Sequence, residues 1–258
     1  MLILDEQTPA ATSNLEFSRI WQVLGPFQIG TREATWGSDP LAFHGGFSSL
    51  EPDERTFASS LAPLGYVSWS ELRADVQAGT NSDCGNEADQ NSFASATSSL
   101  SFPEVDWNAL QSVYGWSALQ WQAWIRGTLT VRGEQELTIE LSLPGILEFE
   151  FDGERHFGGD YYAFGRAPLV QKLSPGSHVL NVRVIRDVRT MGATGPPVLH
   201  LPFLANQVSA SLHVLVGKEL FPDVVLDRGY AGTVCSIPVR NSTDRWLEVI
   251  CIVRLDVS

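Results

Sequence analysis

The sequence has only three cysteines, Cys84, Cys235 and Cys251, and they lie far apart. This number and spacing exclude a disulfide framework and a cysteine zinc site. No apolar run reaches the roughly 18 residues that a membrane-spanning helix needs. The five histidines show no H-x-x-x-H or H-x-H spacing, and neither a phosphate loop nor a dinucleotide fingerprint is present. We therefore expect no metal, no cofactor and no membrane span.

Basic side chains are also scarce. The 258 residues include 17 Lys and Arg against 30 Asp and Glu, a net charge of −13. Residues 1–125 carry four basic and 15 acidic side chains, so the imbalance lies mainly in the first half. Nucleic acid and anionic membrane surfaces attract Lys and Arg, so both are excluded as partners. The excess acid is interpreted as a source of solubility.

The N-terminal residues, MLILDEQTPAATSN, lack a basic region, and their apolar run covers only Leu2 to Leu4. A secretory signal needs both a basic region and a longer apolar run. A cytoplasmic location is therefore predicted.

From residue 121 onwards the sequence alternates between apolar and polar side chains. Trp121, Ala123, Ile125, Leu129 and Val131 occupy the odd positions of the first segment. Residues 137–143, 147–151 and 180–184 repeat the alternation. A period of two is typical of half-buried antiparallel strands, so four strands are predicted to share one core.

The rest of the chain is divided by turn residues and by composition. We predict a first strand over 15–30 with a break at Gly25-Pro26, and surface loops over 31–65. A short strand over 66–69, a helical turn in SELRADV, a long loop over 77–102 and a helix over 107–114 capped by Asp106 follow. Residues 186–206 are predicted to be a connector, and 208–258 to be β again. The prediction is an all-β, antiparallel, jelly-roll-like sandwich over 1–206 with a smaller, incomplete immunoglobulin-like β module over 207–258.

Two levels of resemblance support this fold. Phe151-Asp152-Gly153 followed by LSPGSHVLNVRV resembles the hairpin turns of galactose-binding-like and PA14-like jelly rolls. WQVLGPFQIGTREATWGSDPL, SSLAPLGYVSW, VYGWSALQWQAWIRGTL, HFGGDYYAFGRAPLV and RVIRDVR resemble the N-terminal, non-catalytic half of large fungal prolyl-oligopeptidase-like α/β-hydrolases. The chain stops at Ser258 and has no G-x-S-x-G nucleophile elbow, so no hydrolase activity is expected.

The segment HFGGDYYAFGR gathers groups that can hold a ligand. It supplies an imidazole, a carboxylate, two phenols and a guanidinium, and Gly158-Gly159 allows close approach of the backbone. Alternatively, Tyr161 and Phe164 fill the sandwich while Asp160 pairs with Arg166 or Arg186. The ligand-binding residues predicted from the sequence are Trp124, His156, Asp160, Tyr161, Tyr162, Arg166 and Arg186.

Several other residues were considered for a functional role and also have a structural interpretation. Trp124 stands on the polar face of its strand, so it is covered by a loop, by the C-terminal module or by a ligand. The cluster of Arg183, Arg186, Asp187 and Arg189 is predicted to form solvated salt bridges, and the alternative is an anchor for a ligand carboxylate or carbonyl. His44-Gly45-Gly46 is interpreted as a turn. Asp83, Asn86, Glu87, Asp89 and Asn91 lack the spacing of an EF-hand, which favours a loop over a calcium site.

Two functions remain open, both with a small-molecule ligand as partner and with no signal for an oligomeric state. The favoured one is a cofactor-free isomerase or cyclase that folds an apolar secondary metabolite, for example for an intramolecular cycloaddition, using shape and a few hydrogen-bond donors. The other is a non-catalytic carbohydrate- or partner-binding accessory module.

Overall fold

The computed structural model describes residues 13–31, 38–82, 90–115, 119–157, 168–188, 198–209, 212–214, 239–243 and 246–250. The chain divides into two compact units, residues 1–207 and 208–258. The first unit is built on an antiparallel sheet of 11 strands, which curls into a sandwich of two layers. The predicted all-β antiparallel sandwich is therefore confirmed.

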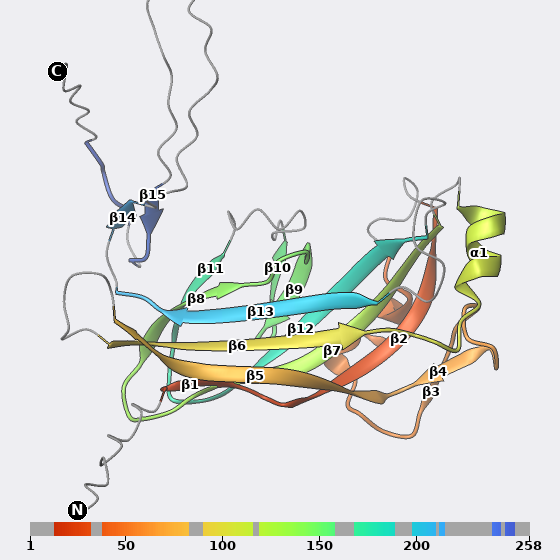
Figure 1. Cartoon of the computed structure of the whole chain (residues 1–258), viewed down its shortest axis with the longest axis horizontal. Helices are drawn as coiled ribbons and strands as arrows, with labels where there is room; N and C mark the ends of the chain where they lie inside the picture. Colours follow the sequence, from red (N-terminus) through yellow and green to blue (C-terminus); the bar gives the residue numbers. More distant parts are fainter. Residues whose placement is uncertain are drawn as a thin grey trace, which may run out of the picture. The chain divides into compact units, whose positions relative to one another are not determined.

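One strand, β5 (Ser70–Ser82), belongs to both layers. Its residues 70–73 pair with β2, and its residues 74–82 pair with β6. Figure 1 shows β5, β6 and β13 side by side, with β2, β7 and β12 crossing behind them. The first layer contains β1 (Leu15–Phe17), β2 (Ile20–Thr31), β7 (Leu119–Val131), β9 (Glu148–Phe151), β10 (Glu154–Phe157) and β12 (Gly176–Asp187). The second contains β6 (Gln90–Leu100), β8 (Leu137–Ser142), β11 (Leu169–Leu173) and β13 (Leu199–Gln207).

The core lies between these layers. The ring of Trp21 on β2 stacks on Phe203 of β13, with centroids 4.8 Å apart. The helix α1 (Trp107–Tyr114) adds Trp107, whose ring lies 5.4 Å from that of Trp121. Asp106 caps this helix as predicted, because its side chain accepts a hydrogen bond from the Ala109 amide. None of the helices in the described ranges is long and apolar enough to cross a membrane.

Gly127 of β7 lies directly beneath the ring of Trp21. A Cβ atom at Gly127 would lie 2.2 Å from Cδ2 of Trp21 and 2.4 Å from Cε2. Gly127→Ala is therefore expected to lower the free energy of unfolding by about 1–3 kcal/mol, measured by urea denaturation, because a fully buried ring has no room to move. Gly79→Ala adds the same methyl group against the half-buried ring of Phe93 and is the control. Equal losses in the two variants would contradict the role of close packing at Gly127.

Three predictions for this unit were wrong. The helical turn in SELRADV and the loop over 77–102 are largely strands β5 and β6, and the end of the connector over 186–206 is strand β13. The inward side chains of β6 include Ser92, Ala94, Ala96 and Ser98, which give little apolar signal in the sequence. The pairing of β6 with β13 explains why these β6 side chains are small, since Ala96 lies opposite Phe203 and Ser98 lies opposite Leu201. Small side chains on β6 leave room for large ones on β13.

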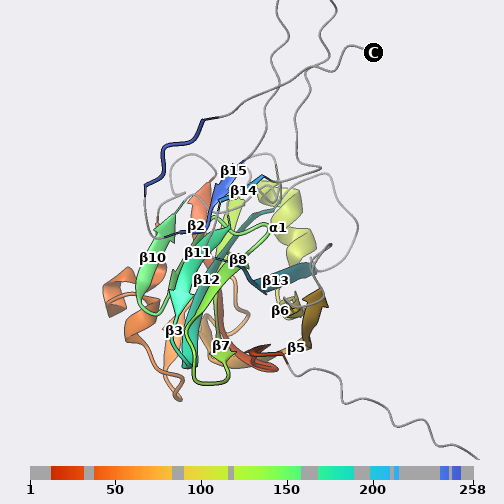
Figure 2. The ribbon, with the colours of Figure 1, turned by 90° about the vertical axis from the view of Figure 1, so that its left-hand side faces the viewer.

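A covered face lies on the other side of the first layer. Residues 38–69, which we call the cover, contain the 3₁₀ helices η1 (Pro40–His44) and η2 (Phe47–Ser49) and the hairpin of β3 (Thr56–Ala58) and β4 (Tyr66–Ser68). Figure 2 shows the orange segment with η1 and η2 on the side of β10, away from α1. The predicted short strand over 66–69 is confirmed as β4. The described part of the predicted surface loops over 31–65 instead contains two 3₁₀ helices and strand β3, and it buries Leu41, Phe47, Leu50 and Phe57.

The second unit contributes β14 (Leu212–Val214), which pairs antiparallel with β15 (Val239–Asn241). Most of residues 208–258 lie outside the described ranges, so the immunoglobulin-like character of this unit stays a prediction.

Candidate functional site

The candidate site is built on the outer face of the first layer, the face turned away from the core. Antiparallel register places directly opposite residues on the same face, which sets two rows there. Glu148, Arg183, Trp124 and Leu24 form one row across β9, β12, β7 and β2. Glu150, Asn181, Arg126 and Gln22 form the next. Polar and charged groups of four strands thus meet under the cover.

The cover buries the ring of Trp124. Phe47 of η2 stacks on this ring with centroids 4.9 Å apart and an interplanar angle of 8°. Only 2% of Trp124 is exposed. The two rings belong to a second apolar cluster, separate from the core, that consists of Leu24, Phe27, Leu41, Phe47, Leu50, Phe57, Val67 and Trp124. Among the alternatives for Trp124, the structure shows coverage by the chain itself.

Arg126 ties the cover to the sheet. Its guanidinium donates to the backbone oxygens of Phe47 and Leu50, and to Oδ1 of Asn181 at 2.9 Å. It also lies over the Phe47 ring, 5.0 Å from the centroid. Burial lowers the pKa of Arg126, while the carboxylates of Glu51 and Glu150 oppose this shift. An arginine remains charged at neutral pH, so the hydrogen bonds from Arg126 to the cover are charge-assisted.

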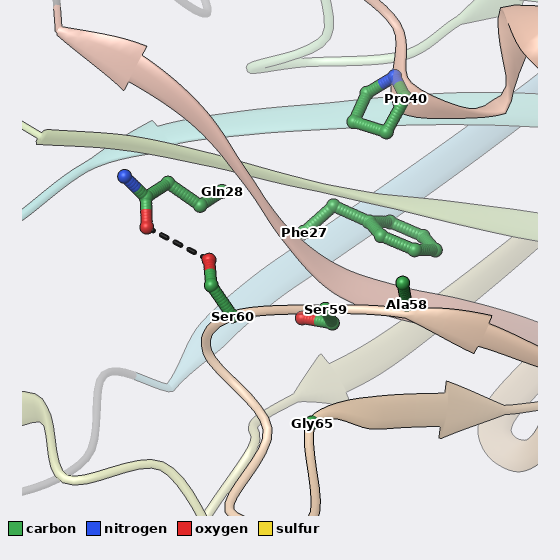
Figure 3. Close-up of a pocket in the computed structure, with 7 residues that line it drawn as sticks. All are labelled: Phe27, Gln28, Pro40, Ala58, Ser59, Ser60 and Gly65. Atoms are coloured by element: carbon green, nitrogen blue, oxygen red, sulfur yellow. Dashed lines mark hydrogen bonds between the residues drawn. The ribbon is translucent and has the colours of Figure 1, made fainter.

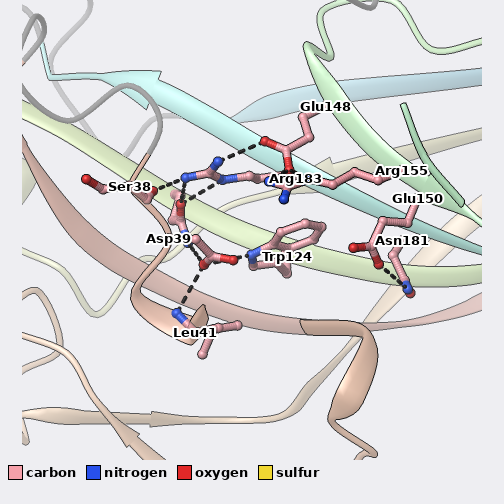
Figure 4. Close-up of polar contacts among 10 residues, drawn as sticks. Ser38, Asp39, Leu41, Trp124, Glu148, Glu150, Arg155, Asn181 and Arg183 are labelled. Carbon is pink, nitrogen blue, oxygen red and sulfur yellow. Dashed lines mark hydrogen bonds and ion pairs between the residues drawn. The ribbon is translucent and has the colours of Figure 1, made fainter. Parts of the chain in front are cut away.

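Arg183 forms a second tie and is more deeply buried. Its Nη1 atom lies 2.8 Å from Oε2 of Glu148, and its Nε donates to Oε1 of Gln122 at 2.9 Å. It also donates to the backbone oxygen of Ser38, the first described residue of the cover. Figure 4 shows the guanidinium between Ser38 and Glu148. The predicted solvated salt bridges are thus wrong for Arg183, which is only 2% exposed.

Asp39 is the third polar link between cover and sheet. Its Oδ1 atom accepts from the Leu41 amide, from Nε2 of Gln122 at 2.8 Å and from Nε1 of Trp124 at 3.3 Å. The first of these bonds caps η1. The carboxylate therefore fixes both the start of η1 and the indole below it.

Two hollows lie at the cover. The larger one, of about 420 Å³, opens beside Asp39. The carboxylate of Glu150 and the guanidinium of Arg155 come from β9 and β10, and Gly45 and Gly46 present backbone from the turn after η1. Glu150 accepts one hydrogen bond in the described part of the chain, from Asn181 to Oε2 at 3.2 Å, which leaves Oε1 available. Glu148 binds Arg155 and holds it in place. The lining residues are Asp39, Ala42, Gly45, Gly46, Phe47, Ser48, Trp124, Glu150 and Arg155.

A smaller hollow of about 270 Å³ lies under another part of the cover. Figure 3 shows its hydrogen bond from Ser60 to Gln28, which is 2.9 Å long. Ser59 is also fixed, since its hydroxyl donates to the Pro26 oxygen. The lining residues are Phe27, Gln28, Pro40, Ala58, Ser59, Ser60 and Gly65.

The predicted ligand-binding residues are only partly described by the structure. Trp124 lines the larger hollow. His156 of β10 stacks on Phe149 with centroids 5.0 Å apart, and its Nε2 atom is buried with no hydrogen-bond partner in the described part of the chain. Arg186 donates to the backbone oxygens of Gly145 and Ile185. Asp160, Tyr161, Tyr162 and Arg166 lie outside the described residues.

The sequence prediction missed Asp39, Glu150 and Arg155. Glu150 carried a signal, because it stands on the polar side of the strand that pairs with 180–183. Asp39 carried none, since it lies in a loop whose contacts are with β7, more than 80 residues away.

No cluster of three or more His, Cys, Asp or Glu that could hold a metal occurs among the described residues. Of the residues weighed for calcium, only Asn91 is described, and it lies in β6. Asp83, Asn86, Glu87 and Asp89 lie outside the described ranges.

Comparisons with known proteins found one curated relative of note. The chain is 41% identical over 213 residues to a protein of Arthroderma benhamiae named "Uncharacterized secreted protein". The match covers 82% of the chain, but the chain spans only 22% of the relative's length. No family model matches the chain, and no solved structure matches it.

The name of this relative contradicts the cytoplasmic location predicted from the sequence. That prediction used only residues 1–14 of the chain.

Proposed function

We propose that this chain is a non-catalytic module that binds a neutral saccharide in the larger hollow. The observation that carries the proposal is the set of charged groups around the hollow, which are the carboxylates of Asp39 and Glu150 and the guanidinium of Arg155. The buried Trp124–Phe47 stack lies beneath them as part of the wall. Sugar hydroxyls both donate and accept hydrogen bonds, so they can use carboxylates and a guanidinium together. A volume of about 420 Å³ is within the usual range for small-molecule sites.

The charges of the hollow favour a polar ligand over an apolar one. An apolar molecule would displace water from Asp39, Glu150 and Arg155 without replacing its hydrogen bonds. Burial of charged groups without such partners is costly. Glu148 and Arg126 partly balance these charges, which favours a ligand without a large net charge.

We also infer that the chain acts outside the cell, because its relative is named a secreted protein. An extracellular location makes polysaccharides and glycans accessible ligands.

The cyclase hypothesis stays a prediction. It depends on a pocket wall formed by residues 156–166, most of which lie outside the described ranges. The resemblance to the non-catalytic half of fungal hydrolases also stays a prediction, because the relative's name states no activity.

Glu150→Ala should weaken saccharide binding about tenfold. This variant removes one charged hydrogen-bond acceptor, and such bonds contribute about 1.5–3 kcal/mol. Calorimetric titration with cello-, laminari- and malto-oligosaccharides measures the dissociation constant. Glu154→Ala is the matched control, since Glu154 is exposed on the same hairpin and does not line the hollow. Failure of the wild-type protein to bind any of these saccharides would overturn the proposed function.

A further inference from the structure

The two hollows lie on two sides of the same short helix, η1. Asp39, Ala42 and Gly45 line the larger hollow, whereas Pro40 lines the smaller one. A 3₁₀ helix has three residues per turn, so residues three apart share a side. Leu41 points to the sheet and is 1% exposed. Helix η1 therefore forms a narrow partition between the hollows.

The same periodicity places Phe43 on the side of Pro40. Its ring is 95% exposed, although large apolar side chains usually bury most of their surface. Sugar rings pack their apolar faces on aromatic rings. Phe43 thus offers an aromatic surface on the partition, on the side of the smaller hollow.

The smaller hollow has the chemistry of a site for hydroxyl groups. None of its lining residues is ionisable. Gln28, Ser59 and Ser60 provide an amide and two hydroxyls, and Figure 3 shows the ring of Phe27 between Pro40 and Ala58, beside these polar groups. The buried Ser59 hydroxyl donates to the Pro26 oxygen and accepts from the Leu61 amide, so the groups presented to a ligand are the exposed hydroxyl of Ser60 and the amide of Gln28, which are hydrogen-bonded to each other. Fixed polar groups around an apolar surface are typical of ligand sites.

The pairing of β2 with β7 gives the separation between Phe27, which lines the smaller hollow, and Trp124, which lines the larger one. Phe27 pairs with Gln122, which is two residues from Trp124 on β7. Two residues of a strand span about 7 Å, and the neighbouring strand adds about 4.8 Å in the perpendicular direction. This separation suits neighbouring or next-neighbouring units of one chain rather than a single sugar ring.

We infer that the smaller hollow is a second saccharide subsite, and that the ligand is an extended neutral oligosaccharide that crosses η1 beside Phe43. This inference rests on the proposed function, because the larger hollow must bind the first sugar unit. Arg155, at one side of the larger hollow, then determines the orientation of the oligosaccharide. The smaller hollow contributes affinity only for longer oligosaccharides.

The test is the dependence of affinity on chain length. Calorimetric titrations with cello-, laminari- and malto-oligosaccharides of two and six units are made on the wild type and on Phe43→Ala and Gln28→Ala. For the series that binds, we expect the hexasaccharide to bind at least about tenfold more tightly than the disaccharide. Both variants should lose most of this gain and keep the disaccharide affinity. Phe43 and Gln28 are exposed, so the variants are expected to fold normally.

Leu64→Ala is the control, because Leu64 is an exposed apolar residue of the cover that lines neither hollow. Equal affinities for the disaccharide and the hexasaccharide would overturn the second subsite and leave the proposed function standing. An unchanged length dependence in both variants would do the same. Absence of binding to every saccharide would overturn the proposed function and the second subsite together.

Discussion

Arg183→Met should lower the free energy of unfolding by about 3–5 kcal/mol. Arg183 and Glu148 are 2% and 4% exposed, and they form an ion pair. Removal of the guanidinium leaves the buried Glu148 carboxylate with Arg155 as its one ion-pair partner among the described residues, and it leaves Oε1 of Gln122 without its Arg183 donor. Loss of a buried partner from a buried charge is among the largest effects that a single substitution produces. Urea denaturation measures the loss.

Arg132→Met is the matched control for this prediction. Arg132 forms an ion pair with Glu16, but both side chains are partly exposed, so a loss of no more than about 1 kcal/mol is expected. Arg183→Lys should fall between wild type and Arg183→Met, because lysine keeps the charge and loses the planar fork that reaches Gln122 and Glu148 together. Equal losses for Arg132→Met and Arg183→Met would show that burial of the Arg183 pair has no special role.

The strands that were predicted correctly have side chains of contrasting polarity on their two faces. Leu137, Ile139 and Leu141 alternate with half-buried polar residues along β8, and the sequence shows this directly. Strand β6 differs, because small residues dominate both faces: Ser and Ala on the buried face, and Ser and Thr on the other. Its buried face is complemented by the bulk of Phe203 and Leu201 on β13. A pattern that depends on a partner strand 100 residues away cannot be seen in a local window.

The candidate site was less predictable for a related reason. Two of its charged residues, Glu150 and Arg183, occupy the outer face of strands that were predicted, so their positions followed from alternation. The deep burial of Arg183 did not follow from alternation, since it depends on residues 38–50 folding back over the sheet. The anomalous position of Trp124 was the one local sign that this face is covered.

Trp124→Ala should lower the free energy of unfolding by about 3–5 kcal/mol, as expected for truncation of a buried aromatic ring. The indole is enclosed by the second apolar cluster, stacks on Phe47 and donates to Asp39. Its loss leaves a cavity beneath η2 and removes one of the groups that hold Asp39, which caps η1. Truncation is therefore expected to loosen the cover as well as the sheet.

Trp246→Ala is the matched control, because Trp246 is fully exposed and its removal should leave stability unchanged. Trp124→Phe should recover part of the loss, since a phenyl ring keeps most of the stacking on Phe47 and lacks only the donor to Asp39. Urea denaturation of the three variants separates packing from hydrogen bonding. If Trp124→Ala kept wild-type stability and lost only saccharide affinity, the indole would be a ligand platform, and its structural role beneath the cover would be refuted.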